Sequence, residues 1–167
     1  MLLALAVTIA AAACSTQTLV DLENGPVPTC DTTSRGRLLL MAQSVPDATL
    51  IPCVDELPAG WELSNAHSRT LESVLLFTTD TFDLDVEVVL SPLCDVSSAR
   101  QIDSLRPGTE LFLGNGGKTF SFVFDGGCIR FDYETSQLAQ SQEGRALRAA
   151  VPFMTRDMLR DLSGWTL

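Results

Sequence analysis

The alternation of apolar and polar residues predicts β-strands in the middle of the chain. From Leu84 to Leu90 every second residue is apolar, and Asp85 and Glu87 occupy two of the intervening positions. Four further segments also have the composition of strands: 73–79, 110–113, 119–124 and 128–133. Turns that contain glycine separate the last three, which favours two antiparallel hairpins in series. A sheet built in this way has one apolar face and one face in water.

Helices are predicted on both sides of this strand region. Residues 36–44 favour a short helix, and 137–150 are rich in alanine, leucine, glutamine and arginine, which are good helix formers. Pro152 should end that helix, and Thr155 can cap another over 156–163. Its expected apolar stripe is Met158, Leu159 and Leu162.

These elements predict an α+β fold. We expect a single antiparallel β-sheet, a meander of about five or six strands, covered by the C-terminal helices and the short N-terminal helix. The expected organisation is 1–13 as a signal peptide, 14–35 as a lipidated N-terminus and tether, and 36–167 as a single α+β domain.

The first fourteen residues are typical of a secretory leader. Between Leu2 and Ala13 only Thr8 is polar, and small residues precede Cys14. A helix of this length would reach about 18 Å, against a bilayer core of about 30 Å, so a signal peptide is favoured over a membrane span. No lysine or arginine precedes Arg35, so the basic start of a signal peptide is not seen.

The segment Ala11-Ala12-Ala13-Cys14 resembles the lipobox of bacterial lipoproteins, although alanine stands where leucine is commonest. The resemblance implies cleavage before Cys14 and attachment of diacylglycerol to its sulfur, with acyl chains such as palmitate. The domain would then be anchored on the extracytoplasmic face of the cell membrane. Two alternatives stay open: a secreted protein cut after Ala13, and an uncleaved anchoring helix.

The cysteine count is consistent with this location. Five cysteines are present, and lipidation of Cys14 would leave four that can pair in an oxidising compartment. Three connectivities are possible, and the pairs Cys30–Cys53 and Cys94–Cys128 close the shorter loops. A zinc site is less favoured, because there is no C-x-x-C pair and the only histidine, His67, is distant from every cysteine in sequence.

Charge restricts the partners. The chain has 21 acidic and 11 basic residues and a net charge of -10. Such a surface repels nucleic acid and anionic headgroups, so we expect no nucleic-acid partner. It suits solubility outside the cell or attraction to a cationic partner.

A second resemblance covers most of the domain. Its residues are 43–53, Leu57-Pro58-Ala59-Gly60-Trp61, Cys94-Asp95, Pro107-Gly108-Thr109 and Gly126-Gly127-Cys128. Together with Val86-Glu87-Val88, they are similar to a group of uncharacterised actinobacterial envelope proteins. The resemblance implies the same location and fold, and no activity.

No motif identifies a reaction or a cofactor. His67 is a poor hydrolase candidate, because it lies in a polar stretch and no G-x-S-x-G is present. The carboxylates near Asp85 lack the spacing of a calcium loop, so a solvated strand face is favoured over a metal site.

An aromatic stripe has two interpretations. Its members on the two predicted hairpin strands are Phe120, Phe122, Phe124, Phe131 and Tyr133. They form either the core or a cup for an apolar ligand.

The sequence therefore predicts a non-enzymatic, membrane-tethered module of the cell envelope that binds a protein or envelope component. The alternatives are a carrier with a Phe-lined cup and, less favoured, a hydrolase that uses His67.

Overall fold

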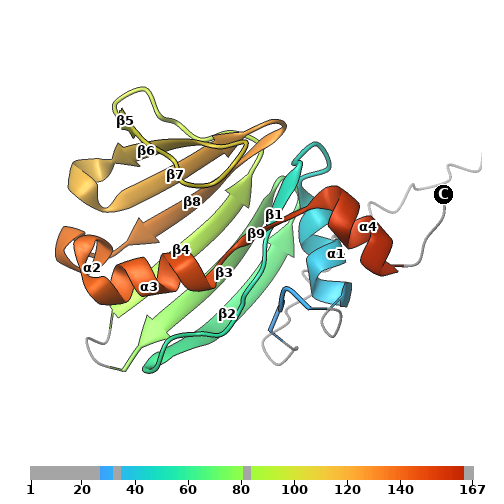
Figure 1. The fold of residues 1–167 in the computed structure, drawn as a ribbon, viewed down its shortest axis with the longest axis horizontal. Helices are drawn as coiled ribbons and strands as arrows, with labels where there is room; N and C mark the ends of the chain where they lie inside the picture. The colour runs from blue at the N-terminus through green and yellow to red at the C-terminus, as the bar shows by residue number, and fades with distance from the viewer. Residues whose placement is uncertain (1–26, 32–34, 81–83, 164–167) are drawn as a thin grey trace, which may run out of the picture.

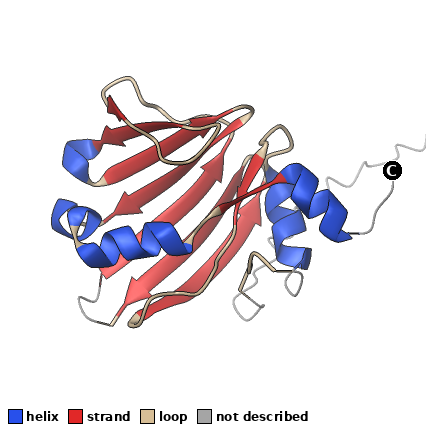
Figure 2. Ribbon diagram, in the orientation of Figure 1, coloured by secondary structure: helices blue, strands red, loops and turns tan. Residues whose placement is uncertain are grey.

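The computed structural model describes residues 27–31, 35–80 and 84–163. It is an α+β structure with one large antiparallel sheet, a separate two-stranded ribbon and four α-helices in this part of the chain (Figures 1 and 2). The leader and Cys14 lie outside the described residues, as does most of the predicted tether. None of the helices in the described ranges is long and apolar enough to cross a membrane.

The elements follow one another along the chain in this order: α1 Arg35–Ser44, β1 Leu50–Pro52, β2 Trp61–Arg69, β3 Glu72–Thr79, β4 Leu84–Ser91, β5 Arg100–Ile102, β6 Glu110–Gly114, the 3-10 turn η2 Asn115–Gly117, β7 Thr119–Phe124, β8 Gly127–Tyr133, α2 Ser136–Gln140, α3 Gln142–Ala150, β9 Phe153–Thr155 and α4 Arg156–Ser163.

The large sheet has seven strands in the order β2-β3-β4-β8-β7-β6-β5, and every neighbouring pair is antiparallel. It consists of two meanders, β2–β4 and β5–β8, which meet where β4 pairs with β8. The chain therefore crosses from β4 in the middle of the sheet to β5 at its far edge. The α+β class and the antiparallel sheet are confirmed, but the strand count is higher than the predicted five or six.

One face of the sheet forms the core. Phe77 on β3, Val88 on β4 and Phe131 on β8 are fully buried, and the register places Val88 directly opposite Phe131. Residues from α1, α3, α4 and the β1–β9 ribbon join the same hydrophobic cluster. The other face of β4 carries Asp85 and Glu87, which are exposed, in agreement with the predicted alternation.

The predicted helix over 137–150 is wrong in one respect, because the structure has two helices there. The Ser141 Oγ accepts a hydrogen bond from the Gly144 N–H at 3.0 Å and caps α3, while Thr135 caps α2 in the same way. The serine side chain satisfies an amide that a continuous helix would bond to a carbonyl.

The segment after Pro152 was also incompletely predicted. Residues Phe153–Thr155 form β9, which pairs with β1, before Thr155 caps α4 as expected through the Met158 N–H. Leu159 is buried, but Met158 is 54 % exposed and does not belong to an inward apolar stripe. The side chain of Leu162 lies outside the described residues.

Two disulfides join the cysteines in the pairing that was expected because it closes the shorter loops. Cys30–Cys53 attaches the segment 27–31 to the end of β1, next to a bridge between Thr29 and Val54. Cys94–Cys128 attaches the long β4–β5 connection to the start of β8. Both pairs therefore fix segments that have little regular structure of their own.

Candidate functional site

The four phenylalanines of the predicted cup lie on the inner face of β7 and β8. Phe131 is fully buried, and Phe120, Phe122 and Phe124 are at most 9 % exposed. Phe122 makes edge contacts with Phe131 at 5.8 Å and with Phe153 of β9 at 5.2 Å between ring centroids. The rings therefore pack against one another as a core layer.

Arg106, from the β5–β6 loop, covers part of this layer. Its guanidinium carbon lies 3.9 Å from the ring centroid of Phe153 and 4.9 Å from that of Phe122. The same group donates hydrogen bonds to the carbonyl oxygens of Val151, at 2.9 Å, and of Arg148. These carbonyls lie at the C-terminal end of α3, so Arg106 joins the loop to the end of that helix.

Arg148, on α3, covers the neighbouring part of the layer. Its guanidinium lies 3.8 Å from the Phe120 centroid and 5.4 Å from that of Tyr133. Its Nη1 donates to the Tyr133 hydroxyl oxygen at 3.0 Å and to the Ala139 carbonyl at 2.8 Å, and the Tyr133 hydroxyl in turn donates to the Gly144 carbonyl. We call these seven residues the arginine–aromatic cluster: Arg106, Arg148, Phe120, Phe122, Phe131, Tyr133 and Phe153.

Burial changes the acid–base properties of this cluster. Desolvation, with a further contribution from the nearby Arg148 charge, lowers the pKa of Arg106 to about 10. Burial raises the pKa of the Tyr133 hydroxyl to about 12, although both arginines act in the opposite direction. Sequence reasoning found the aromatic stripe and missed the arginines, because they come from a loop and a helix with no periodic relation to the strands.

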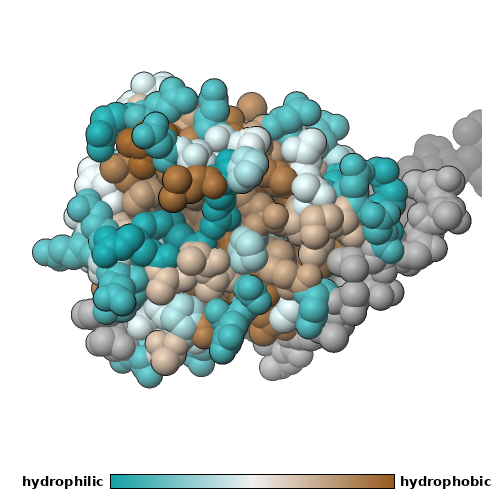
Figure 3. Space-filling view, in the orientation of Figure 1, coloured by the Kyte–Doolittle hydropathy of each residue, from teal (hydrophilic) through white to brown (hydrophobic). Residues whose placement is uncertain are grey.

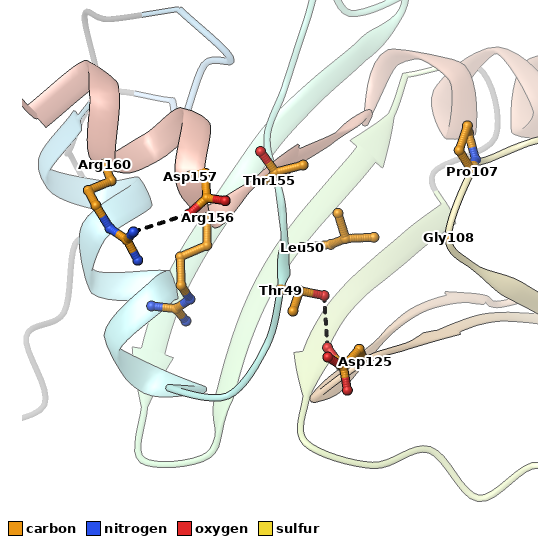
Figure 4. Close-up of a pocket in the computed structure, with 9 residues that line it drawn as sticks. All are labelled: Thr49, Leu50, Pro107, Gly108, Asp125, Thr155, Arg156, Asp157 and Arg160. Carbon is orange, nitrogen blue, oxygen red and sulfur yellow. Dashed lines mark hydrogen bonds and ion pairs between the residues drawn. The ribbon is translucent and has the colours of Figure 1, made fainter.

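A separate open groove lies where α4 begins (Figure 4). Its volume is about 660 Å³, and its lining residues are Thr49, Leu50, Pro107, Gly108, Asp125, Thr155, Arg156, Asp157 and Arg160. We call it the α4 groove. In it the Thr49 hydroxyl donates to the Asp125 carbonyl at 2.8 Å, and Arg160 forms an ion pair with Asp157 at 3.2 Å. The Arg156 guanidinium donates to carbonyls at and just after the C-terminus of α1, so its charge is engaged in joining α4 to α1.

A second hollow of about 410 Å³ shares Gly108 and Asp125 with the α4 groove. Val123 and Phe124 give it apolar walls, and Glu110 lies at its edge. Among the described residues, no basic side chain forms an ion pair with Glu110 or Asp125. The two hollows therefore combine apolar surface with available carboxylates.

Large apolar side chains are exposed at the same end of the sheet. Leu71 follows β2, Leu93 follows β4 and Leu105 follows β5, and they are 57 %, 85 % and 97 % exposed. The strand register places these three connections together with the β7–β8 turn, and we call this end the loop end. Figure 3 shows apolar and polar side chains intermixed on one face of the molecule.

His67 does not assemble a catalytic group in the described part of the chain. It lies on β2, partly exposed, opposite Val74, and no described side chain forms a hydrogen bond or ion pair with it. The same ranges contain no cluster of three or more His, Cys, Asp or Glu residues that could hold a metal ion.

No protein-family model, curated protein or solved structure matches this chain.

Proposed function

We propose that the protein is an extracytoplasmic lipoprotein, tethered through Cys14, whose folded domain binds a protein or another envelope component without catalysing a reaction. The observation that carries the binding function is the loop end, where three exposed leucines lie at the same end of the sheet as two preformed hollows. Single exposed apolar residues are common on protein surfaces, but several at one end of a sheet that also carries a groove favour an interaction site.

The two disulfides indicate an oxidising, extracytoplasmic environment. Anchoring there through Cys14 is part of the proposal and rests on the lipobox-like segment. A tether would keep the domain close to partners in the same envelope and raise their effective concentration.

The chemistry of the loop end favours a cationic partner with apolar side chains. Glu110 and Asp125 are exposed beside Val123 and Phe124, so a basic side chain could place its aliphatic stem on the apolar wall and its charge at the carboxylates. The net charge of -10 would attract such a partner over a longer range.

Site-specific photo-crosslinking in the native host tests the binding site. A photo-reactive residue at position 157, which is exposed in the α4 groove, should give a discrete crosslinked product. The matched control is position 134, an exposed acidic residue just after β8, at the opposite end of the sheet. Equal labelling from both positions, or none from position 157, would count against a binding site at the loop end.

Intact mass spectrometry of protein extracted from the native membrane tests the tether. We expect a chain that begins at an acylated Cys14 and is four hydrogens lighter than the reduced form. A mature chain without acyl groups would support the secreted alternative, and an unprocessed chain would contradict both.

A further inference from the structure

The two arginines of the arginine–aromatic cluster are unusual in this protein because no acid accompanies them. The chain has almost twice as many acidic as basic residues. Even so, within the described ranges Arg106 and Arg148 form no ion pair, while Arg69, Arg130 and Arg160 each do. The charged group that acts most strongly on Arg106 is Arg148, which has the same sign.

Both arginines are half-buried residues. Their known acceptors are three backbone carbonyls and one phenol, all of them neutral. Two like charges that share a region of low dielectric repel each other, and neutral acceptors do not cancel that repulsion. An anion placed between the two guanidinium groups would cancel this repulsion.

Each guanidinium also keeps unused donors. A guanidinium carries five N–H groups in a planar fork. Arg148 uses only its Nη1 for the described contacts, which leaves Nη2 and Nε without a partner among the described residues. Arg106 likewise uses one contact from each Nη, and its Nε makes none in the same part of the chain.

We infer that Arg106 and Arg148 form a binding site for a phosphate group. Phosphate carries up to two negative charges and oxygens spaced for paired N–H donors, so it suits two adjacent guanidinium groups. The aromatic rings beneath hold both side chains in place before the ligand arrives, which reduces the entropy that binding would cost.

The surroundings of the site also suit an apolar substituent on the phosphate. Leu113 lies directly opposite Phe120, the ring beneath Arg148, and both Leu113 and Ile102 of the neighbouring strands are only partly buried. Inorganic phosphate and the phosphate ester of an amphiphile share the same headgroup chemistry, and their relative affinity distinguishes the two sources. This site shares the β5–β6 loop with the loop end, because Arg106 directly follows Leu105, but neither Arg106 nor Arg148 lines the α4 groove.

The competing explanation is that the two arginines only seal the core and cap helix ends. It predicts no saturable response to phosphate. The test is therefore a titration of the folded protein with sodium phosphate and, separately, with a medium-chain alkyl phosphate below its micelle concentration. Sodium chloride at matched ionic strength controls for screening.

The ring signals of Tyr133 report on the site in NMR spectra, because this is the only tyrosine in the chain. We expect saturable shifts of these signals in at least one titration, and a rise in Tm of roughly 5 °C at about 100 times Kd. Similar affinities for both ligands would indicate a small-anion site. Tighter binding of the alkyl phosphate, by about tenfold or more, would indicate an amphiphile.

The decisive variant is Arg148→Gln, with Arg145→Gln as its matched control, since Arg145 is exposed on the same helix. Arg148→Gln should weaken binding by at least about tenfold, and the control should leave it unchanged. If Arg148→Gln does not fold, Arg148→Lys retains the charge but loses the planar fork, and it should still bind several-fold more weakly. The inference is overturned if the wild-type signals do not saturate by about 10 mM of either ligand, or if the folded position-148 variant binds as tightly as the wild type.

Discussion

The Arg106 guanidinium lies 3.9 Å from the centre of the Phe153 ring, although the two residues are almost fifty positions apart in sequence. Arg106 belongs to the β5–β6 loop and Phe153 to β9, so this contact joins the outer edge of the sheet to the ribbon that crosses its inner face. Together with the hydrogen bond to the Val151 carbonyl, it holds an irregular loop against the core.

Arg106→Met should destabilise the fold more than its partial exposure suggests. The change removes two charge-assisted hydrogen bonds and two cation–π contacts, and leaves the Arg148 and Val151 carbonyls unpaired. We expect a loss of about 2–3 kcal/mol in the free energy of unfolding, measured by urea denaturation. Arg100→Met, at an exposed position on β5, should change it by less than about 0.5 kcal/mol. Equal effects of the two variants would contradict the anchoring role.

Tyr133 should make stability fall at alkaline pH. Its pKa is raised to about 12 in the folded protein against 10.0 for an unperturbed tyrosine, so the unfolded chain loses the proton first. The stabilisation is complete below pH 10 and is lost as the pH rises through 12, and two pKa units correspond to roughly 3 kcal/mol.

The lowered pKa of Arg106 acts in the opposite direction over the same range, so wild type must be compared with Tyr133→Phe. The difference between their unfolding free energies should shrink between pH 10 and 12. The absorption of the single tyrosinate provides a direct check. If it develops near pH 10 in the native protein, the hydroxyl is not buried as described.

Two glycines with almost the same φ angle should respond differently to alanine. Gly126 has φ +74° and Gly108 has φ +72°. A Cβ on Gly126 would lie 1.7 Å from the Asp47 carbonyl oxygen, whereas nothing lies within 4 Å of one on Gly108. We expect Gly108→Ala to cost about 1 kcal/mol from backbone strain alone and Gly126→Ala at least about 3 kcal/mol, measured by thermal or urea unfolding. Similar losses of stability in the two variants would show that the turn after α1, which contains Asp47, moves away from the added Cβ.

The elements with strong periodicity were predictable from the sequence. The strands around Val88, Phe122 and Phe131 lie where their patterns place them, because burial of one face determines them. The short helix that ends at Ser44 was expected from its composition, since the segment is too short to show a period. The three-residue strands β5 and β9 were not predicted, because they are too short for a period and form only through pairing with distant strands.

The order of the strands in the sheet also could not be predicted from local sequence patterns. Pairing of β4 with β8 depends on contacts such as Val88 with Phe131, which lie far apart in the chain. The loop end and the two arginines of the arginine–aromatic cluster were missed for the same reason. The loop end unites connections after β2, β4 and β5, and the arginine–aromatic cluster unites a loop, a helix and three strands.

Each disulfide should contribute stability of similar size. Cys30–Cys53 spans 23 residues and Cys94–Cys128 spans 34, and loop-closure entropy predicts roughly 3–4 kcal/mol for each. The paired alanine variants should therefore lose comparable amounts in urea denaturation. Limited proteolysis should distinguish the two variants. We expect new cleavage near residue 30 when Cys30–Cys53 is removed, and within the β4–β5 connection when Cys94–Cys128 is removed. Unchanged cleavage in both would show that the disulfides do not restrain these segments.

Leu105 should matter for binding and not for folding. Its side chain is 97 % exposed, while the adjacent Arg106 and the hydrogen bond between the Ser104 and Thr109 hydroxyls hold its loop in place. Leu105→Ser should therefore change the free energy of unfolding by less than about 0.5 kcal/mol, whereas Leu90→Ala, at a fully buried position, should cost about 3 kcal/mol.

If Leu105 is an apolar anchor at the loop end, Leu105→Ser should also reduce photo-crosslinking from position 157 by about tenfold, because a rigidly presented apolar side chain can dominate an interface. Leu40→Ser is the matched control, since Leu40 is an exposed leucine on α1, outside the connections that form the loop end. If wild type and Leu105→Ser crosslink equally and both fold, Leu105 does not belong to the binding surface. That surface would then consist of the groove alone.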